Sequence, residues 1–400
     1  MRYFDRIIRA ILLLRCVARV VLFGRADKVP EKISRVIVVP TGKLGDVVCC
    51  TPVLRAIRTH LPHARIIVAG NSKLHRPLLV DSGLVDEYLD LVSPGALGRT
   101  KRCRADVALV TGPSYGAAAL LCAAGVPLVV SARVEGGFSP SETRPYKILK
   151  RLIKTFPYRI GEHAPRERLR VLESLGIFSD DTTKHLGFSE SGSRKVDQFF
   201  LDHNLDLAKD FVVGMSLSSG NKIKEWPVDR FAKVADYLYE KYRAMVVIIG
   251  TKGDCEKTKE MLSFLDRKTK ATDAAGVFDL DQLKAFISKL HLFISVDTGP
   301  IYIAESFNVP TIDIVGPVDE RVQPPRGLIH RNVVPPHRVK PELSILNARS
   351  YNQAESLRQV LSITVPLVLE TINKLIGDLP RSHRQQHVVD ETDNRMLNYQ

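Results

Sequence analysis

Residues 35–57 read RVIVVPTGKLGDVVCCTPVLRAI, and this stretch decides the fold. It opens with the β-branched run Arg35–Val39, passes through the glycine-containing loop Pro40–Asp46, and ends in a helical run that includes Leu54 and Ile57. A strand, a tight turn and a helix in this order form the unit from which parallel sheets are built. We therefore predict that an α/β domain begins near residue 35.

Seven further short apolar runs repeat the strand pattern. They lie at residues 65–69, 106–110, 127–130, 211–216, 245–250, 292–296 and 311–315. Continuous apolar strands that alternate with helices are typical of a parallel sheet covered on both faces. Residues 135–210 lack this rhythm, so the pattern predicts two Rossmann-like, doubly wound α/β domains that meet near residues 180–208.

The predicted organisation has five parts, which a chain of 400 residues can accommodate. They are a basic, apolar N-terminal segment (1–30), an N-terminal Rossmann-like domain (31–190), a C-terminal Rossmann-like domain (191–345), a helical segment (346–378) and a polar tail (379–400). One helix is predicted from about residue 353 to 376. The composition of the tail, from Pro380 onward, predicts disorder.

The charge of the chain is strongly positive. Its formal net charge is +14, and the surplus gathers at residues 1–30, 142–170 and 321–340. Such basic patches attract phosphorylated glycans, nucleotides, acidic membrane surfaces and nucleic acid, although lysine and arginine also serve simply to solvate helical faces. No aromatic-rich basic sheet or recognition helix supports nucleic-acid binding.

Six cysteines are scattered without CxxC pairs or metal-type spacing. This pattern favours reduced thiols in a cytoplasm. Cys49 and Cys50 directly follow the first loop, and we interpret them as packing residues.

The N-terminal segment is apolar but interrupted by arginines. Within Ile7–Arg15, no apolar run approaches the roughly 20 residues that a spanning helix needs. Two interpretations are open: an interfacial helix on a membrane surface, or a helix docked on the core of the protein itself. A cleaved signal peptide fits the arginine pattern less well.

Ligands of open α/β sheets bind beyond the carboxyl ends of the strands, so the loops that follow strands are the candidate sites. The first such loop contains Asp46 at the start of a helix, where a carboxylate is also a natural helix cap. The second, Ser218–Pro227, offers hydroxyls, a glycine and two ammonium groups before the only tryptophan. It suits a phosphate anchor, or it is an ordinary solvated loop in which Trp226 packs.

Two later loops have the same position. In Asp297–Glu305, the backbone of Thr298 and Gly299 is suited to hold phosphates while Asp297 shapes the loop, or the two polar residues only cap a helix. Gly316–Asp319 either closes the ligand crevice beyond the carboxyl ends of these strands or is simply a turn.

Other nucleotide motifs are missing. The sequence has no GxG dinucleotide fingerprint, and Gly42 and Lys43 lack the upstream glycine of a P-loop. The one DxD motif, Asp279–Asp281, opens a predicted helix, so we interpret it as a helix cap and predict no metal site.

Taken together, these loops resemble glycosyltransferase family 9, the ADP-heptose:lipopolysaccharide heptosyltransferases, from about residue 35 to 375. The family's Leu-Gly-Asp motif appears at Leu44–Asp46, and its Thr-Pro helix start appears at Thr51–Ala56. Its Lys-x-Trp-Pro, Asp-Thr/Ser-Gly-Pro and Gly-Pro-x-Asp motifs appear at 224–227, 297–300 and 316–319. The stretch 163–168 (HAPRER) is similar to the family's link before the second domain.

The resemblance implies a GT-B fold whose two domains face a central cleft, with an acceptor-binding N-terminal domain and a donor-binding C-terminal domain. It implies inversion at the anomeric carbon without a metal, with Asp46 as the general base and Lys224 neutralising the departing diphosphate. The expected donor-binding residues are Ser218, Ser219, Lys222, Lys224, Asp297, Thr298, Gly299 and Pro300. The expected acceptor-binding residues are Thr41, Lys43, Arg133 and Arg144, although exposed arginines are also often only solvated.

The predicted function is therefore transfer of a sugar, heptose from ADP-heptose, to a lipopolysaccharide core or related lipid-linked anionic glycan. No cofactor beyond the nucleotide sugar is expected. We expect a cytoplasmic protein with peripheral contact to an acidic membrane surface and no nucleic-acid partner. Two alternatives stay open: the same fold with another nucleotide sugar, and a non-catalytic relative that binds glycan or membrane.

Overall fold

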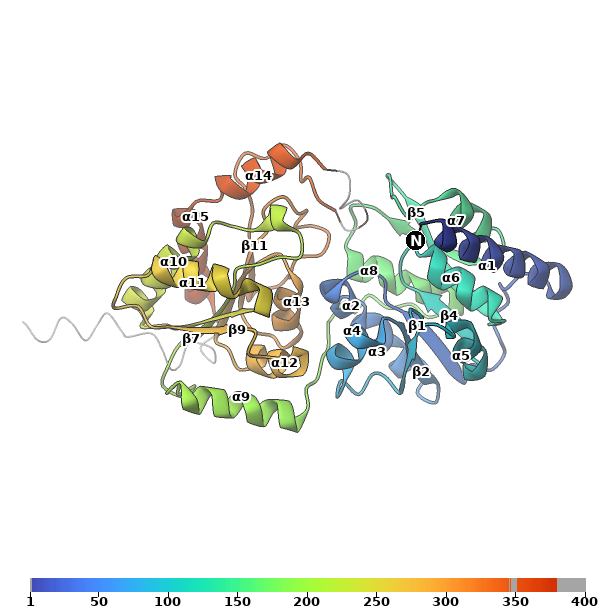
Figure 1. Ribbon diagram of the computed structural model, residues 1–400, viewed down its shortest axis with the longest axis horizontal. Helices are drawn as coiled ribbons and strands as arrows, with labels where there is room; N and C mark the ends of the chain where they lie inside the picture. Colours follow the sequence, from blue (N-terminus) through green and yellow to red (C-terminus); the bar gives the residue numbers. More distant parts are fainter. Residues whose placement is uncertain (1, 345, 347–350, 380–400) are drawn as a thin grey trace, which may run out of the picture. The chain divides into compact units, whose positions relative to one another are not determined.

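The computed structural model describes residues 2–344, 346 and 351–379 (Figure 1). The tail predicted from Pro380 onward lies outside these residues. Packing divides the chain into two compact units. Unit 1 comprises Met1–Ser189, Asp319–Gln323 and Glu342–Tyr351, and unit 2 comprises Glu190–Val318, Pro324–Pro341 and Asn352–Gln400. Residues 319–323 and 342–344 thus pack with unit 1, whereas the sequence pattern placed them in the second domain.

Unit 1 is built on a six-stranded parallel sheet with the order β3-β2-β1-β4-β5-β6. Its strands are β1 (Arg35–Val39), β2 (Arg65–Gly70), β3 (Glu87–Asp90), β4 (Val107–Val110), β5 (Leu128–Glu135) and β6 (Lys154–Arg159). Its helices are α1 (Arg2–Phe23), α2 (Leu44–Val48), α3 (Thr51–His60), α4 (Ser72–Leu79), α5 (Ala96–Cys103), α6 (Tyr115–Ala123), α7 (Arg144–Leu149) and α8 (Ala164–Leu169). A 3-10 helix, η1 (Arg170–Leu175), follows α8.

The centre of this sheet is buried on both faces, as its continuous apolar strands predict. Val36–Val39 in β1 and all of β4 are buried, and helices lie on both sides of the sheet (Figure 1). The parallel direction brings the carboxyl ends of β1 and β4 together, since Val39 pairs with Val110 in the ladder. The loop that carries Asp46 therefore begins at the centre of the sheet.

Unit 2 repeats this plan with the strand order β12-β11-β10-β7-β8-β9. Its strands are β7 (Val212–Ser216), β8 (Met245–Gly250), β9 (Ala271–Ala275), β10 (Leu292–Val296), β11 (Thr311–Ile314) and β12 (His330–Val333). Its α-helices are α9 (Glu190–Asp202), α10 (Val228–Tyr242), α11 (Cys255–Ser263), α12 (Leu280–Ser288), α13 (Gly299–Ser306), α14 (Gln353–Ser362) and α15 (Val365–Asp378). Two 3-10 turns, η2 (Lys222–Lys224) and η3 (Lys252–Asp254), lie in its loops.

The single helix predicted for residues 353–376 is wrong, because the structure has two helices there. α14 ends at Ser362 and α15 begins at Val365. Thr364 caps α15 by accepting a hydrogen bond from the N–H of Leu367, and a proline follows in the first turn. Proline has no N–H and clashes with the preceding turn, so the helix restarts there.

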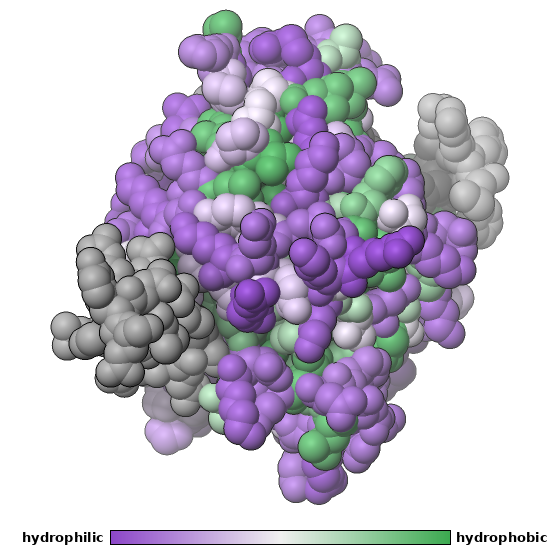
Figure 2. Space-filling view, turned by 90° about the vertical axis from the view of Figure 1, so that its left-hand side faces the viewer, coloured by the Kyte–Doolittle hydropathy of each residue, from purple (hydrophilic) through white to green (hydrophobic). Residues whose placement is uncertain are grey.

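The apolar residues of α14 and α15 pack into the core of unit 2. Val360, Val368, Ile372 and Leu375 belong to the same buried cluster as Trp226. Figure 2 shows a mostly hydrophilic face of this unit, with hydrophobic residues in small groups. Within the described ranges no single helix is long and apolar enough to span a bilayer, and only the bent pair of α14 and α15 meets that test by length and composition.

Candidate active site

Asp46 lies in the first turn of α2, directly after the loop that leaves β1. Its Oδ2 accepts a hydrogen bond from the backbone N–H of Lys43 at 2.8 Å, and Lys43 is the N-cap of the helix. The capping interpretation of Asp46 is therefore correct for one carboxylate oxygen. The other oxygen has a different partner.

Arg168 supplies that partner from α8. Its Nη2 donates to Asp46 Oδ1 at 2.7 Å, so the two side chains form an ion pair. The Arg168 side chain is only 2% exposed, while that of Asp46 is 18% exposed. The pair thus has a buried cation and a carboxylate that solvent still reaches.

A returning segment of unit 1 holds Arg168 in place. Both terminal nitrogens of its guanidinium lie within 3.4 Å of Gln323 Oε1. The N–H of Ala164, at the start of α8, donates to the carbonyl oxygen of Val322 at 2.8 Å. Residues 319–323 therefore fix both the first turn of α8 and the arginine near its end.

The surroundings of Arg168 favour its charged form. Burial opposes the charge, but the negative charges that Tyr158, Asp46, Cys49 and Cys50 carry when they are ionised raise its pKa above the usual range of arginine. Burial in turn raises the pKa of Tyr158 to about 12 and that of Cys50 to about 11. Asp46 thus faces a permanent cation among neutral, buried neighbours, and both cysteines are fully buried packing residues, as predicted.

Gly42 makes room for the Asp46 carboxylate. Its φ of +116° lies in the region that favours glycine. A Cβ at this position would lie 2.2 Å from Asp46 Oδ2, which is an impossible contact. The glycine of the loop therefore serves the position of the carboxylate as well as the turn.

This arrangement leaves Asp46 able to accept further hydrogen bonds. Each carboxylate oxygen has two lone pairs, and the protein uses one of them on each oxygen through Lys43 N–H and Arg168. The side chain remains partly exposed. A hydroxyl group that approaches from solvent can therefore donate to Asp46 without breaking either contact.

The other residues predicted for unit 1 are spread more widely. The N–H of Thr41 donates weakly to Thr111 Oγ1 at 3.4 Å, beside the Asp46 loop, and the Lys43 residue is exposed. Arg133 forms an ion pair with Glu135 at 2.7 Å. Arg144 is the exposed first residue of α7. In the described ranges no hydrogen bond or ion pair joins Arg133 or Arg144 to Asp46.

In unit 2, Lys224 and Asp297 form the centre of the predicted donor site. Lys224 Nζ lies 2.8 Å from Asp297 Oδ2 and also donates to the Asp297 carbonyl oxygen. Tyr302, on α13, donates its hydroxyl to the other carboxylate oxygen of Asp297. Asp297 is nearly buried, so its position is fixed from two sides.

The start of α13 follows Asp297 directly in the chain. Thr298 is the N-cap in an extended conformation, and Gly299 and Pro300 form the beginning of the first turn. The first N–H groups of a helix have no acceptor within the helix, and they attract anions. The ammonium group and the helix start together suit a phosphate group.

A second carboxylate organises the loop after β7. Glu225 accepts from the N–H of Ser219 at 2.9 Å and from Lys222 Nζ at 2.9 Å, and Lys257 pairs with it from α11. Burial raises the pKa of Glu225, but these hydrogen bonds outweigh it and lower the pKa below the usual value. Ser218, the remaining predicted residue of this loop, is half-buried.

Trp226 is a packing residue, as one of the two interpretations of this loop proposed. It is 2% exposed and its ring packs edge-on against Phe231. Its Nε1 donates to the carbonyl oxygen of Ile363 at 2.9 Å. The tryptophan thus anchors the loop to the segment between α14 and α15.

Behind Asp297 lies a buried acid, Asp313 on β11. Neither of its carboxylate oxygens has a hydrogen-bond partner in the part of the chain that the structure describes. Burial, and then the charge of Asp297, raise its pKa well above the usual value, although Lys224 acts in the opposite direction. The site therefore favours the neutral acid at this position.

Two other acidic motifs have structural explanations. Asp279 Oδ1 accepts from the N–H of Gln282 at 2.9 Å, so the DxD motif is a helix cap, as predicted. Asp319 binds Arg321 through both carboxylate oxygens, each at 2.9 Å. Among the described residues no group of three His, Cys, Asp or Glu side chains is placed to hold a metal ion.

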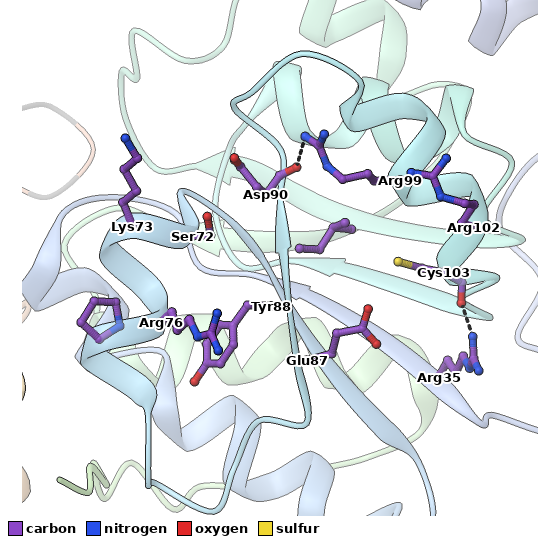
Figure 3. Close-up of a pocket in the computed structure, with 12 residues that line it drawn as sticks. Arg35, Ser72, Lys73, Arg76, Glu87, Tyr88, Asp90, Arg99, Arg102 and Cys103 are labelled. Carbon is purple, nitrogen blue, oxygen red and sulfur yellow. Dashed lines mark hydrogen bonds between the residues drawn. The ribbon is translucent and has the colours of Figure 1, made fainter. Parts of the chain in front are cut away.

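A pocket of about 620 Å³ lies elsewhere on unit 1, around the edge strand β3 (Figure 3). Residues of α4, β3 and α5 line it, and none of the predicted site residues is among them. Arg99 closes one side by donating to the carbonyl oxygen of Asp90 at 2.9 Å. The pocket is separate from the contacts around Asp46.

The residues missed from the sequence are the partners that hold the predicted ones. They are Arg168, Gln323, Glu225, Lys257, Tyr302 and Asp313. Arg168 is the last residue of the HAPRER stretch, which was the one available signal. Glu225 and Tyr302 lie inside the candidate loops 218–227 and 297–305, at positions to which the sequence pattern assigns no role.

Two six-stranded parallel sheets, each wound with helices on both faces, define an α/β protein of the GT-B class. Residues 99–348, more than half of the chain, match the family described as glycosyltransferase family 9 (heptosyltransferase). The chain belongs to this family.

Curated relatives are similar to parts of the chain. Lipopolysaccharide heptosyltransferase 3 of Escherichia coli is 30% identical over 163 residues, which cover 40% of this chain and 45% of the relative. The match thus spans less than half of that protein. Lipooligosaccharide heptosyltransferase 2 of Campylobacter jejuni is 24% identical over 288 residues, which cover 68% of this chain and 79% of the relative.

Solved structures share the fold over a larger part of the chain. A family 9 glycosyltransferase from Veillonella parvula aligns with a TM-score of 0.70 at 21% identity, covering 87% of this chain and 99% of its own. E. coli ADP-heptose lps heptosyltransferase II aligns with a TM-score of 0.65 at 19% identity, covering 85% and 98%. These matches confirm the predicted fold class.

Proposed function

We propose that this protein is an inverting, metal-independent heptosyltransferase. It transfers heptose from ADP-heptose to a lipopolysaccharide core or a related lipid-linked anionic glycan, at the cytoplasmic face of a membrane. Its membership of glycosyltransferase family 9 and its likeness to lipopolysaccharide heptosyltransferases support this reaction class. The single observation that carries the mechanism is the partly exposed Asp46 carboxylate with its spare lone pairs.

In this reaction Asp46 is the general base. An acceptor hydroxyl donates its proton to Asp46 while its oxygen attacks the anomeric carbon of the donor sugar. The new carbon–oxygen bond forms as the bond to the diphosphate breaks, so the electron pair leaves with ADP and the configuration inverts. A positioned base of this kind contributes about 10²- to 10⁴-fold to such rates.

Lys224 and the start of α13 receive the leaving group. The charge that develops on the diphosphate is matched by the Lys224 ammonium group and by the N–H groups of Thr298 and Gly299. A solved relative with this fold, E. coli heptosyltransferase WaaC, was crystallised with ADP and with ADP-2-deoxy-2-fluoro heptose. That precedent supports an ADP-sugar as the donor here, and no cofactor beyond it takes part.

The acceptor is an anionic glycan on a lipid. Lys43 lies directly beside Asp46, and Thr41 precedes it in the same loop. Arg133 and Arg144 contribute positive charge to the same unit and contact acceptor phosphates. Residues 142–170 carry a large share of the net positive charge of +14, which supports attraction of such an acceptor.

The test is a transfer assay with a panel of donors. Purified protein is incubated with ADP-heptose, or with ADP-, GDP-, UDP- and CDP-hexoses, together with extracted lipid-linked glycan, and the products are weighed by mass spectrometry. We expect one added heptose with ADP-heptose, and no transfer by Asp46→Asn, which still binds ADP. Transfer from another nucleotide sugar but not from ADP-heptose would contradict the proposed donor. Undiminished transfer by Asp46→Asn would contradict the role of Asp46 as the general base.

A further inference from the structure

The helix α1 has an apolar face that the described residues leave exposed. Leu14 is 68% exposed, Val21 78% and Phe23 81%. The other large apolar residues exposed on this helix are Ile7, Ile8, Ile11, Val17 and Leu22. No other helix of the described chain exposes so many large apolar side chains.

The opposite face of α1 is fixed to the protein. The helix runs along α6 (Figure 1), where Cys16 Sγ donates to the carbonyl oxygen of Ala119 at 3.3 Å. Arg19 Nη2 donates to the carbonyl oxygen of Val126 at 2.8 Å, and the Tyr115 hydroxyl donates to that of Arg9 at 2.5 Å. These bonds set the rotation of the helix, so its outer face cannot turn inward.

Five of these exposed residues form one stripe along the helix. Ile7, Ile11, Leu14, Val21 and Leu22 recur at intervals that place them on the same side, opposite Cys16. On the surfaces of soluble proteins, large apolar residues are normally isolated from one another. A continuous apolar stripe marks a contact with a partner or a membrane. The helix is therefore docked on its own protein by one face and free to bind by the other.

The charges around this stripe are positive. Arg15 lies on the flank of the stripe and is exposed, and it has no ion pair or side-chain hydrogen bond with any described residue. The neighbouring α7 contacts α1 and adds the exposed Lys147 and Ile148, with Arg151 just beyond its end. An apolar stripe among cations favours an anionic lipid surface over a second copy of the same chain, whose like charges would repel.

We propose that the outer face of α1 lies in the plane of an anionic bilayer, with Leu14, Val21 and Leu22 among the acyl chains and Arg15 and Lys147 at the lipid phosphates. The helix then acts as an anchor that lies on the membrane and holds unit 1 against it. The inference rests on the surfaces of α1 and α7 and does not require the proposed transfer reaction.

Vesicle flotation with the full-length protein tests this proposal. Vesicles of phosphatidylcholine alone are compared with vesicles that also contain phosphatidylglycerol. We expect binding that requires phosphatidylglycerol and falls about tenfold or more in Leu14→Glu and in Val21→Glu. Leu201→Glu is the matched control, because Leu201 is a leucine of α9 that is 71% exposed, and it should bind like the wild type.

A charge series tests the second half of the proposal. Arg15→Gln and Lys147→Gln should each weaken binding to phosphatidylglycerol vesicles by about fivefold, since one basic residue at an anionic surface contributes about 1 kcal/mol. Circular dichroism and ADP binding should be unchanged in all these variants, which separates loss of the anchor from misfolding and from loss of the donor site. Wild-type binding by both glutamate variants would overturn the proposal. So would a dimer in sedimentation velocity that both variants abolish, with no binding to either vesicle.

Discussion

Arg168 Nη2 and Asp46 Oδ1 lie 2.7 Å apart, although the two residues are 122 positions apart in the sequence. The ion pair links the loop after β1 to α8, and through Gln323 to a segment that lies between two stretches of unit 2 in the sequence. Because Arg168 is buried and Asp46 is partly exposed, the arginine would act on the proposed reaction only through the carboxylate. A change at Asp46 therefore alters both the stability of unit 1 and its chemistry.

A double-variant comparison separates these two effects. Asp46→Asn leaves a buried guanidinium without its counter-ion, and loss of one partner of a buried pair costs about 3–5 kcal/mol. Replacing both partners with uncharged residues is often nearly neutral. We therefore expect Asp46→Asn to be strongly destabilised and Asp46→Asn/Arg168→Met to recover most of the free energy of unfolding.

Transfer activity, unlike stability, should not be recovered in the double variant. Neither variant has a carboxylate at residue 46, so both should lose about 10²-fold or more in kcat. Denaturant unfolding and transfer rates measured on the same preparations check both parts. Recovery of activity together with stability in the double variant would show that Asp46 is needed only for folding.

The central strands of both sheets were predictable from the sequence, and the edge strands were not. All eight predicted strands are present and occupy the four inner positions of each sheet. The four missed strands, β3, β6, β9 and β12, are the two edges of each sheet. Strands buried on both faces are continuous apolar runs, whereas edge strands such as His330–Val333 (HRNV) face solvent and carry polar residues.

The same reasoning explains what could be predicted of the site. Residues in loops after central strands, such as Asp46 in unit 1 and Lys224 and Asp297 in unit 2, are found from local pattern because each parallel sheet gathers its own loops at the carboxyl ends of its strands. Their partners come from elements far away in the sequence, as Arg168 does for Asp46. The pattern of one sequence does not show which distant residues contact each other. A charged residue on a short helix is therefore interpreted as solvent-exposed until the fold is known.

Gly42 provides a test of how tightly the Asp46 carboxylate is held. Gly42→Ala introduces a Cβ that would lie 2.2 Å from Asp46 Oδ2, so the carboxylate must leave Lys43 or Arg168. Gly125→Ala is the matched control, since Gly125 also has a positive φ but nothing lies within 4 Å of its Cβ. Both variants incur about 1–2 kcal/mol of backbone strain.

We expect only Gly42→Ala to lose transfer activity, by about tenfold or more, because misplacement of a reacting group by a fraction of an ångström is costly. Thermal unfolding and kcat of the two variants measure the comparison. Equal activity in the two alanine variants would mean that the carboxylate tolerates displacement.

Lys224 should bind the diphosphate, and its removal should weaken donor binding. Lys224→Met removes the ammonium group beside the start of α13 and should lower ADP affinity about tenfold or more, because charge-assisted contacts contribute about 1.5–3 kcal/mol each. Lys289→Met is a suitable control. Lys289 pairs with Asp197 in the same unit and is 22% exposed, against 16% for Lys224. Calorimetric titration with ADP decides the matter, and equal affinities in the two methionine variants would remove Lys224 from the donor site.

Asp313 makes the stability of unit 2 depend on pH. Its pKa is raised in the folded state, first by burial and then by Asp297, whereas an unfolded aspartate titrates near about 3.9. The folded protein therefore binds this proton more tightly than the unfolded chain does. The bound proton of Asp313 therefore stabilises the folded state. This contribution is complete below about pH 4 and is lost as the pH rises through the pKa of Asp313 in the folded protein.

Asp313→Asn keeps the shape of the side chain and removes the titration. We expect the variant to gain stability relative to the wild type as the pH rises from about 4 toward 8. Each kcal/mol recovered should raise the Tm of a unit of this size by about 2–4 °C. Calorimetric unfolding of both proteins across this pH range provides the measurement.

Asp313 has no hydrogen bond among the described residues that the substitution could break, so a rising difference in Tm reports the charge alone. A constant difference across the pH range would mean that Asp313 ionises in the folded protein as it does in the unfolded chain.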